Sequence, residues 1–328
     1  VPVDLTYEDT RNSVVALFAD ATYSLSDQLD VFGGIRYSDY KNTTGVGIDV
    51  LAAQRTSKVT DKDISGRIGL SYKPADNATI YGSLSRGYKP PAIVVPTIGT
   101  QPVTVLSPEK ATAIEIGGKV ELGRIQLSAN VFHTKVKDFQ VQTQNFDAAG
   151  ALVSVTQNIS QVKSKGFELG AFGRISDNFT INAGYQFNDV KFPGGFLGND
   201  GLPLGGRQFL NAPKHKFTVS GEFSQPLSEA IELFANANLV YKSKVLFAQY
   251  GNPDYRYPAH EIVNIGLGVR SAEDTWRVAL FVRNLTKERE PTAYLASDFA
   301  GNADGGIRAW PAAGLTARVV GISAGFDF

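Results

Sequence analysis

The chain of 328 residues has no cysteine and no methionine. The lack of cysteine excludes disulfide frameworks, thiolate zinc sites and cysteine nucleophiles. Because the first residue is Val1 and no methionine occurs, we expect the natural start and any signal peptide to lie outside this chain, which we interpret as a fragment. No run of about 18 apolar residues occurs, so no helical membrane span is expected.

Charge of one sign is not in excess either. Lys plus Arg equals Asp plus Glu at 32 each, so a basic groove for nucleic acid has no electrostatic support. An apolar content of 43% with 20% charged residues nevertheless indicates an ordered chain. We therefore expect a folded protein that does not bind nucleic acid.

What the chain does contain is a period-two alternation of apolar and small or polar residues, with 33 glycines and 11% aromatics. In the C-terminal stretch, Val320, Ile322, Ala324, Phe326 and Phe328 fall on one face, and the residues between them are small or polar. The stretch from Phe179 to Asn188 repeats this pattern. One apolar and one polar face predict an all-β, antiparallel up-and-down transmembrane barrel with a polar lumen.

Connections between the predicted strands alternate between short and long. Short turns are expected around residues 26–27, 74–77, 122–123, 176–178, 226–229 and 272–274. Long polar connections are expected near residues 42–62, 89–109, 138–161, 192–213, 243–259 and 286–313. Outer-membrane barrels have this asymmetry, with short turns in the periplasm and long loops outside the cell.

The alternation gives about 13 spanning strands, with the first beginning near Asn12. Residues 1–11 are then a remnant of an extracellular loop, and residues 12–328 are the C-terminal portion of a barrel. An odd number of strands cannot close, and unpaired edges are costly in lipid. We therefore expect further strands in the parent protein, without which this piece would not insert stably.

Several strings resemble the barrel of TonB-dependent receptors. They include "SLSRGYKPP" near Ser83, "LSPEKATAIEIGGK" near Leu106, "NISQVKSKGFELG", "NAPKHKFTVSGEF", "LFVRNLTKEREPTAY" and the terminal "GISAGFDF". They occur in family order over nearly the whole chain. The resemblance implies a barrel of about 22 strands with a plugged lumen, of which this chain supplies roughly the last 13. The plug domain and the segment that engages TonB are missing from these residues.

The function implied by this resemblance is active transport of a scarce large nutrient across the bacterial outer membrane, most often a ferric siderophore. Cobalamin, haem or an oligosaccharide stay open as substrates, and a passive porin-like diffusion channel is the alternative from another class. A receptor role for phage or bacteriocins would use the same loops. An outer-membrane hydrolase is not expected, because only His260 of the three histidines points inward and no suitable neighbour accompanies it.

The partners implied by the resemblance are the TonB-ExbB-ExbD energy-coupling complex, reached through the missing plug region, and the barrel assembly machinery. Outer-membrane lipid, lipopolysaccharide and a small-molecule or metal-chelate ligand complete the expected set. We expect no enzymatic activity, no cofactor and no resident metal.

Candidate residues fall into three groups. Rings and cations in the long loops and at the rim are candidates for substrate binding: Arg207, Phe209, Tyr250, Tyr255, Arg256, Tyr257, His260, Tyr294, Arg308 and Trp310. Alternation places a second group in the lumen, facing a plug: Arg36, Arg67, Glu115, Lys119, Glu168, Glu222, Glu232, Arg277 and Arg283. A third group resembles the C-terminal signal that the assembly machinery recognises: Ile322, Ala324, Phe326 and Phe328.

Overall fold

The computed structural model describes residues 6–48, 55–95, 103–146, 152–198, 201–247, 256–296, 307–311 and 317–327. These residues form strands and connections, and no helix among them is long and apolar enough to cross a membrane. The predicted residues Tyr250, Tyr255 and Phe328 lie outside the described part.

Thirteen strands form one sheet, in the order β1-β2-β3-β4-β7-β8-β9-β10-β11-β12-β15-β16-β19. Every neighbouring pair is antiparallel, which confirms the predicted fold class and number of strands. The strands are β1 (Thr6–Ser26), β2 (Leu29–Ile48), β3 (Arg55–Ala75), β4 (Ala78–Lys89), β7 (Glu109–Leu122), β8 (Ile125–Phe146), β9 (Leu152–Ser176), β10 (Phe179–Lys191), β11 (His215–Pro226), β12 (Ile231–Lys242), β15 (His260–Ser271), β16 (Trp276–Arg283) and β19 (Val319–Phe326).

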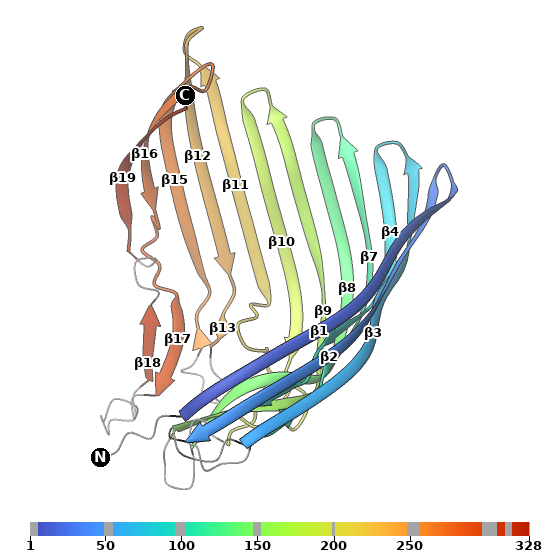
Figure 1. Ribbon diagram of the computed structural model, residues 1–328. Coiled ribbons are helices and arrows are strands. Elements are labelled where there is room, and N and C mark those ends of the chain that lie inside the picture. The colour runs from blue at the N-terminus through green and yellow to red at the C-terminus, as the bar shows by residue number, and fades with distance from the viewer. Residues whose placement is uncertain are drawn as a thin grey trace.

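The sheet curls into a trough whose two edges are β1 and β19 (Figure 1). Short turns join the strands at one end, and the long connections lie at the other. Three two-stranded sheets stand in the long connections: β5 (Ala92–Val94) with β6 (Thr104–Leu106), β13 (Val245–Leu246) with β14 (Arg256–Tyr257), and β17 (Pro291–Ala296) with β18 (Ile307–Pro311). The predicted alternation of short and long connections is therefore confirmed.

Several strands are longer than the sequence pattern predicts. β1 begins at Thr6 instead of near Asn12, since residues 6–11 pair with residues 43–48 of β2. Likewise, β2 continues to Ile48 and β3 starts at Arg55, so the long connection expected at 42–62 is mostly strand. A span needs only about 9 to 11 residues. Beyond it both faces meet water, so the backbone ladder continues without the apolar alternation that reveals a strand in sequence.

Directly paired residues share a face of the sheet, so the register assigns every strand residue to one face. The outer face is apolar and exposed: Leu17 is 74% and Ile322 71% accessible. Within β19, Ile322, Ala324 and Phe326 stand opposite Leu280, Val278 and Trp276 of β16, as their alternation predicts. Apolar side chains this exposed along a sheet face suit contact with lipid.

The buried hydrophobic core lies among the long connections instead of inside the trough. Its cluster joins strand residues to the 192–213 connection: Val141, Ile159, Val162, Val190, Phe192, Leu204, Phe209 and Leu246. Leu204 is fully buried. This core holds the long connections in a fixed arrangement at one end of the trough. Side chains at that end can therefore be held in place to form a site.

Candidate functional site

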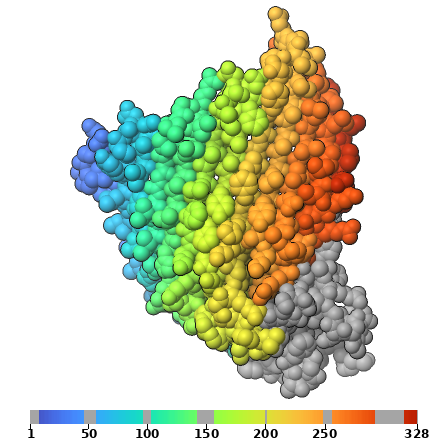
Figure 2. All heavy atoms as spheres, turned by 180° about the vertical axis from the view of Figure 1, so that it is seen from behind, coloured from blue at the N-terminus to red at the C-terminus, as the bar shows by residue number. Residues whose placement is uncertain are grey.

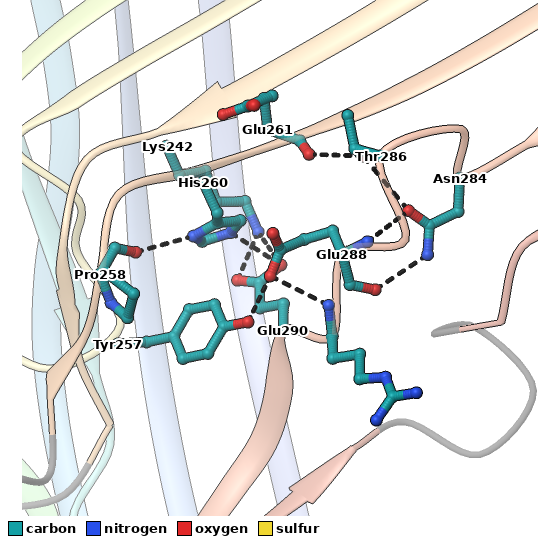
Figure 3. Close-up of polar contacts among 10 residues, drawn as sticks. Lys242, Tyr257, Pro258, His260, Glu261, Asn284, Thr286, Glu288 and Glu290 are labelled. Atoms are coloured by element: carbon teal, nitrogen blue, oxygen red, sulfur yellow. Dashed lines mark hydrogen bonds and ion pairs between the residues drawn. The ribbon is translucent and has the colours of Figure 1, made fainter.

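A cluster of charged residues lies at the rim, where β12 ends and β15 begins (Figure 3). Lys242 Nζ lies 2.8 Å from both carboxylate oxygens of Glu290. His260 Nε2 lies 3.4 Å from Glu290 Oε2, and its Nδ1 lies 3.0 Å from the carbonyl oxygen of Pro258. The His260 side chain is 2% exposed. Glu290 thus lies between an ammonium group and a buried imidazole, which can form an ion pair with it when protonated.

The turn after β16 brings Glu290 to this place. Asn284 adopts a positive φ of 51°, which asparagine tolerates better than most residues. Its side chain accepts from the Glu288 amide and donates to the Glu288 carbonyl, both at 2.8 Å. Thr286 fastens the turn to β15 by donating to the carbonyl oxygen of Glu261 at 2.8 Å. Tyr257 donates from its hydroxyl to Glu288 Oε1 (Figure 3).

A polar pocket of about 400 Å³ lies beside this cluster. Its lining includes the inner-face residues Gln186, Asn188, Lys216 and Lys242, together with Glu290. Asn211, Val245 and Phe247 from the connections complete one side. Amide, ammonium and aromatic groups around a hollow of this size suit a small polar or anionic molecule.

All nine residues predicted for the lumen share the inner face by register. Several have partners there. Arg67 is 3.2 Å from Asp20, Glu168 accepts from Gln186 at 2.7 Å and from Asn130 at 3.2 Å, and Arg36 donates to Ser38 at 3.1 Å. Contact of this face with a plug stays a prediction.

One inner-face residue that the sequence analysis missed is Arg270 of β15. It donates to Glu232 at 3.0 Å and to Glu222 at 3.2 Å, bringing together two of the predicted residues. The Arg270 guanidinium also lies 5.4 Å from the centroid of the Phe234 ring. The parity that put His260 inward also puts Arg270 inward, ten residues later on the same strand. The signal was therefore present in the alternation.

The other predicted residues of this face are divided between paired and unpaired groups. Glu115 accepts from the Tyr81 hydroxyl, and the Arg283 guanidinium lies 5.1 Å from the Phe281 ring centroid. Lys119 and Arg277 make no ion pair within the described part of the chain. A second hollow, of about 540 Å³, lies against this face and includes Glu222, Arg277 and Arg283 in its lining.

Comparison with known proteins decides the family. A family model described as "TonB dependent receptor-like, beta-barrel" matches residues 2–285. The chain belongs to this family. TonB-dependent receptor barrels are outer-membrane proteins of bacteria, which confirms the predicted localisation, and the family consists of transport receptors, not enzymes.

Two relatives of this receptor barrel are named as receptors, one for a siderophore and one for ferric pyoverdine. The probable TonB-dependent siderophore receptor PiuA of Acinetobacter baumannii is 26% identical over 291 residues, covering 83% of this chain and 36% of PiuA. The ferric-pyoverdine receptor PbuA of Pseudomonas sp. strain M114 is 25% identical over 280 residues, covering 83% of this chain and 32% of PbuA. The chain therefore spans about a third of the length of these curated relatives.

Solved structures agree on the fold. The ferric yersiniabactin uptake receptor FyuA of Yersinia pestis superimposes with a TM-score of 0.80 at 22% identity, covering 98% of this chain and 47% of FyuA. The siderophore receptor PiuA of Acinetobacter baumannii gives a TM-score of 0.71 at 20% identity. At these identities the likeness shows the barrel fold alone.

The loop residues predicted to bind substrate are scattered in this receptor barrel. Phe209 is buried in the core cluster, with its ring centroid 4.5 Å from that of Phe192 and 5.4 Å from that of Phe139. Arg207 is half-buried in the same connection, and Arg256 lies in β14. Tyr294 lies in β17, and Arg308 and Trp310 lie in β18, but their side chains are outside the described part. Of the predicted residues whose side chains the structure describes, Tyr257 and His260 join the rim cluster.

Proposed function

We propose that this barrel serves TonB-dependent uptake of a ferric siderophore across the outer membrane. The observation that carries the proposal is the polar pocket at the rim, whose ammonium groups Lys216 and Lys242 face a hollow of about 400 Å³ on the inner face. The names of the relatives PiuA and PbuA support an iron chelate as the ligand class. Energy coupling would come through a plug and the TonB-ExbB-ExbD complex, for which the family resemblance is the support.

Lys216 is the residue of the pocket that suits an anionic ligand. Lys242 is already neutralised by Glu290, whereas Lys216 makes no ion pair within the described residues. A hydrogen bond between an ammonium group and an anion contributes about 1.5 to 3 kcal/mol, roughly 10- to 150-fold in affinity. Lys216→Gln should therefore weaken binding of an anionic ferric chelate by that factor.

The experiment is uptake of radioactive iron by iron-starved cells that carry the whole receptor. Uptake of one chelate should need both this receptor and TonB, and Lys216→Gln should lower the affinity. Lys244→Gln is the matched control, because Lys244 is exposed close by in sequence but does not line the pocket. Uptake that persists without TonB would instead support a passive channel, and uptake of cobalamin, haem or an oligosaccharide alone would replace the siderophore.

We also propose two points about the whole protein. The thirteen strands form the C-terminal part of a closed barrel of about 22 strands, since unpaired edges in lipid are costly. The apolar alternation Ile322, Ala324, Phe326 and Phe328 acts as the signal for the assembly machinery. Replacing Phe328 by Ser should lower the amount of receptor in the outer membrane, measured by surface labelling, and an unchanged amount would refute the signal.

A further inference from the structure

The register brings lysines of neighbouring strands together on the outer face. Lys135 of β8 stands directly opposite Lys163 of β9, and Lys163 stands opposite Lys191 of β10. One step along, His133 stands opposite Lys165, and on the other side Lys110 stands opposite Lys137. We call Lys135, Lys137, Lys163 and Lys165 the lysine cluster. Three of the four are exposed, and Lys135 is half-buried.

The lysine cluster borders the apolar part of the outer face. On the same face, Phe167 stands two residues beyond Lys165 on β9, and Val131 stands four residues beyond Lys135 on β8; the two are paired with each other. The cluster lies toward the long connections, away from the short turns that join β7 to β8 and β9 to β10. Figure 2 shows this outer face over the middle strands of the sheet. In an outer-membrane barrel this position is the outer surface of the bilayer.

Like charges that stand directly opposite on neighbouring strands destabilise a sheet. Asp189 of β10 stands directly opposite Lys165, but its carboxylate is turned to other lysines, at 3.3 Å from Lys191 and 3.9 Å from Lys214. Within the described residues, no residue of the lysine cluster makes an ion pair. The sheet itself gains nothing from the repulsion, so an anion from outside the chain would relieve it.

The cations at the opposite end of these strands are arranged differently. Arg124, in the turn between β7 and β8, donates to the carboxylate of Asp177 in the turn after β9, and this hydrogen bond lowers the pKa of Asp177 from its usual value. Arg174 donates to the carbonyl oxygen of the same residue. These two arginines near the short turns therefore have partners within the protein, in contrast to the lysine cluster.

An apolar groove lies on the same outer face as the lysine cluster, further toward the short turns. It encloses about 730 Å³, and its lining includes Leu127, Leu169, Tyr185 and Phe217. Leu169 is four residues from Lys165 along β9, which is about 14 Å at roughly 3.4 Å per residue. Cations above an apolar groove, at the surface of a membrane, match an anionic head group that carries acyl chains.

We propose that the lysine cluster binds the phosphorylated head group of an outer-leaflet lipid, whose acyl chain lies in the groove below it. Lysine ammonium groups are strong partners of phosphate oxygens. The phosphates would lie between opposed lysines and remove their repulsion. The site needs only the placement of the barrel in the outer membrane, so it does not depend on the siderophore proposal.

Native mass spectrometry of the whole receptor in detergent tests the site with three probes: lipid A carrying both phosphates, the same lipid without phosphates, and inorganic phosphate. The test variant combines Lys135→Gln, Lys163→Gln and Lys165→Gln. The control combines Lys41→Gln, Lys58→Gln and Lys62→Gln on the outer face of β2 and β3, where no lysine opposes another cation. Each lysine near an anionic lipid surface contributes roughly fivefold in binding.

The test variant should bind the phosphorylated lipid about 100-fold more weakly, whereas the control should bind like the wild type. The wild type should bind the lipid without phosphates far more weakly than the phosphorylated one. Equal affinity of the test variant and the wild type, or equal affinity for both lipids, would overturn the proposal. Efficient competition by inorganic phosphate would also overturn it, because a free anion would then be the ligand.

Thermal unfolding in lipid-free detergent gives a second readout. It would reveal a test variant that has lost its fold. Removing opposed charges should leave the midpoint of the test variant unchanged or raise it. Phosphorylated lipid should then raise the midpoint of the wild type but not that of the variant. A lower midpoint of the variant without lipid would show that the lysines stabilise the sheet and would contradict the repulsion on which the proposal rests.

Discussion

Leu204→Ala is the change that should show most clearly what holds the long connection between β10 and β11. Leu204 has 0% exposure and belongs to the hydrophobic cluster that includes Phe192 and Phe209. The Phe192 ring is stacked on Phe196 at 5.0 Å between centroids. The backbone of Leu204 donates to the Phe196 carbonyl at 2.9 Å, and alanine keeps this bond. The substitution therefore removes packing alone.

The expected cost follows from complete burial. Replacing a buried leucine by alanine typically costs about 2 to 5 kcal/mol, since the cavity adds to the lost transfer free energy. If the connection opens locally while the sheet stays folded, the substitution destabilises the closed connection relative to the open one by this same free energy. The open population should then rise by about 30-fold to several thousand-fold, at 1.36 kcal/mol for each tenfold.

The assay is tryptic cleavage on intact cells that display the whole receptor, followed at Arg207 within the connection. When opening is rapid, the cleavage rate follows the open population, so it should rise by the same factor. Leu202→Ala is the matched control, because Leu202 is 48% exposed in the same connection. Equal cleavage rates for the two variants would refute the idea that this cluster holds the connection closed.

Two further substitutions test the sheet. A Cβ on Gly166 would lie 2.0 Å from the carbonyl oxygen of Phe187, so Gly166→Ala should sharply reduce folded receptor on unheated gels, whereas Gly87→Ala, whose nearest contact is 3.6 Å, should not. Arg270→Met removes the shared partner of two glutamates and should cost about 1 to 3 kcal/mol. Its thermal midpoint should recover when both glutamates are replaced by glutamine, and failure to recover would show that packing of Arg270 matters more than its charge.

The candidate site was only partly predictable, for reasons that particular residues illustrate. Parity along β15 was enough to place His260 inward, but its partner Glu290 follows the turn at Asn284 and has no periodic signal. Phe209 looked like a ring available to a ligand, yet it is packed against Phe139 and Phe192. A loop aromatic is exposed or buried according to what folds over it, and local sequence does not contain that information.

By itself, the sequence determined the number of spanning strands, the end with short turns and the face of each spanning residue. The physical reason is that a strand spanning the lipid must be apolar on its outer face and may be polar on its inner face. Apolar and polar residues therefore alternate along the strand with a period of two. Tertiary structure alone decided the extension of β1 to Thr6, the core around Leu204 and the opposition of Lys135 to Lys163. These depend on the register between strands and on packing between distant segments, neither of which leaves a periodic trace in a single strand.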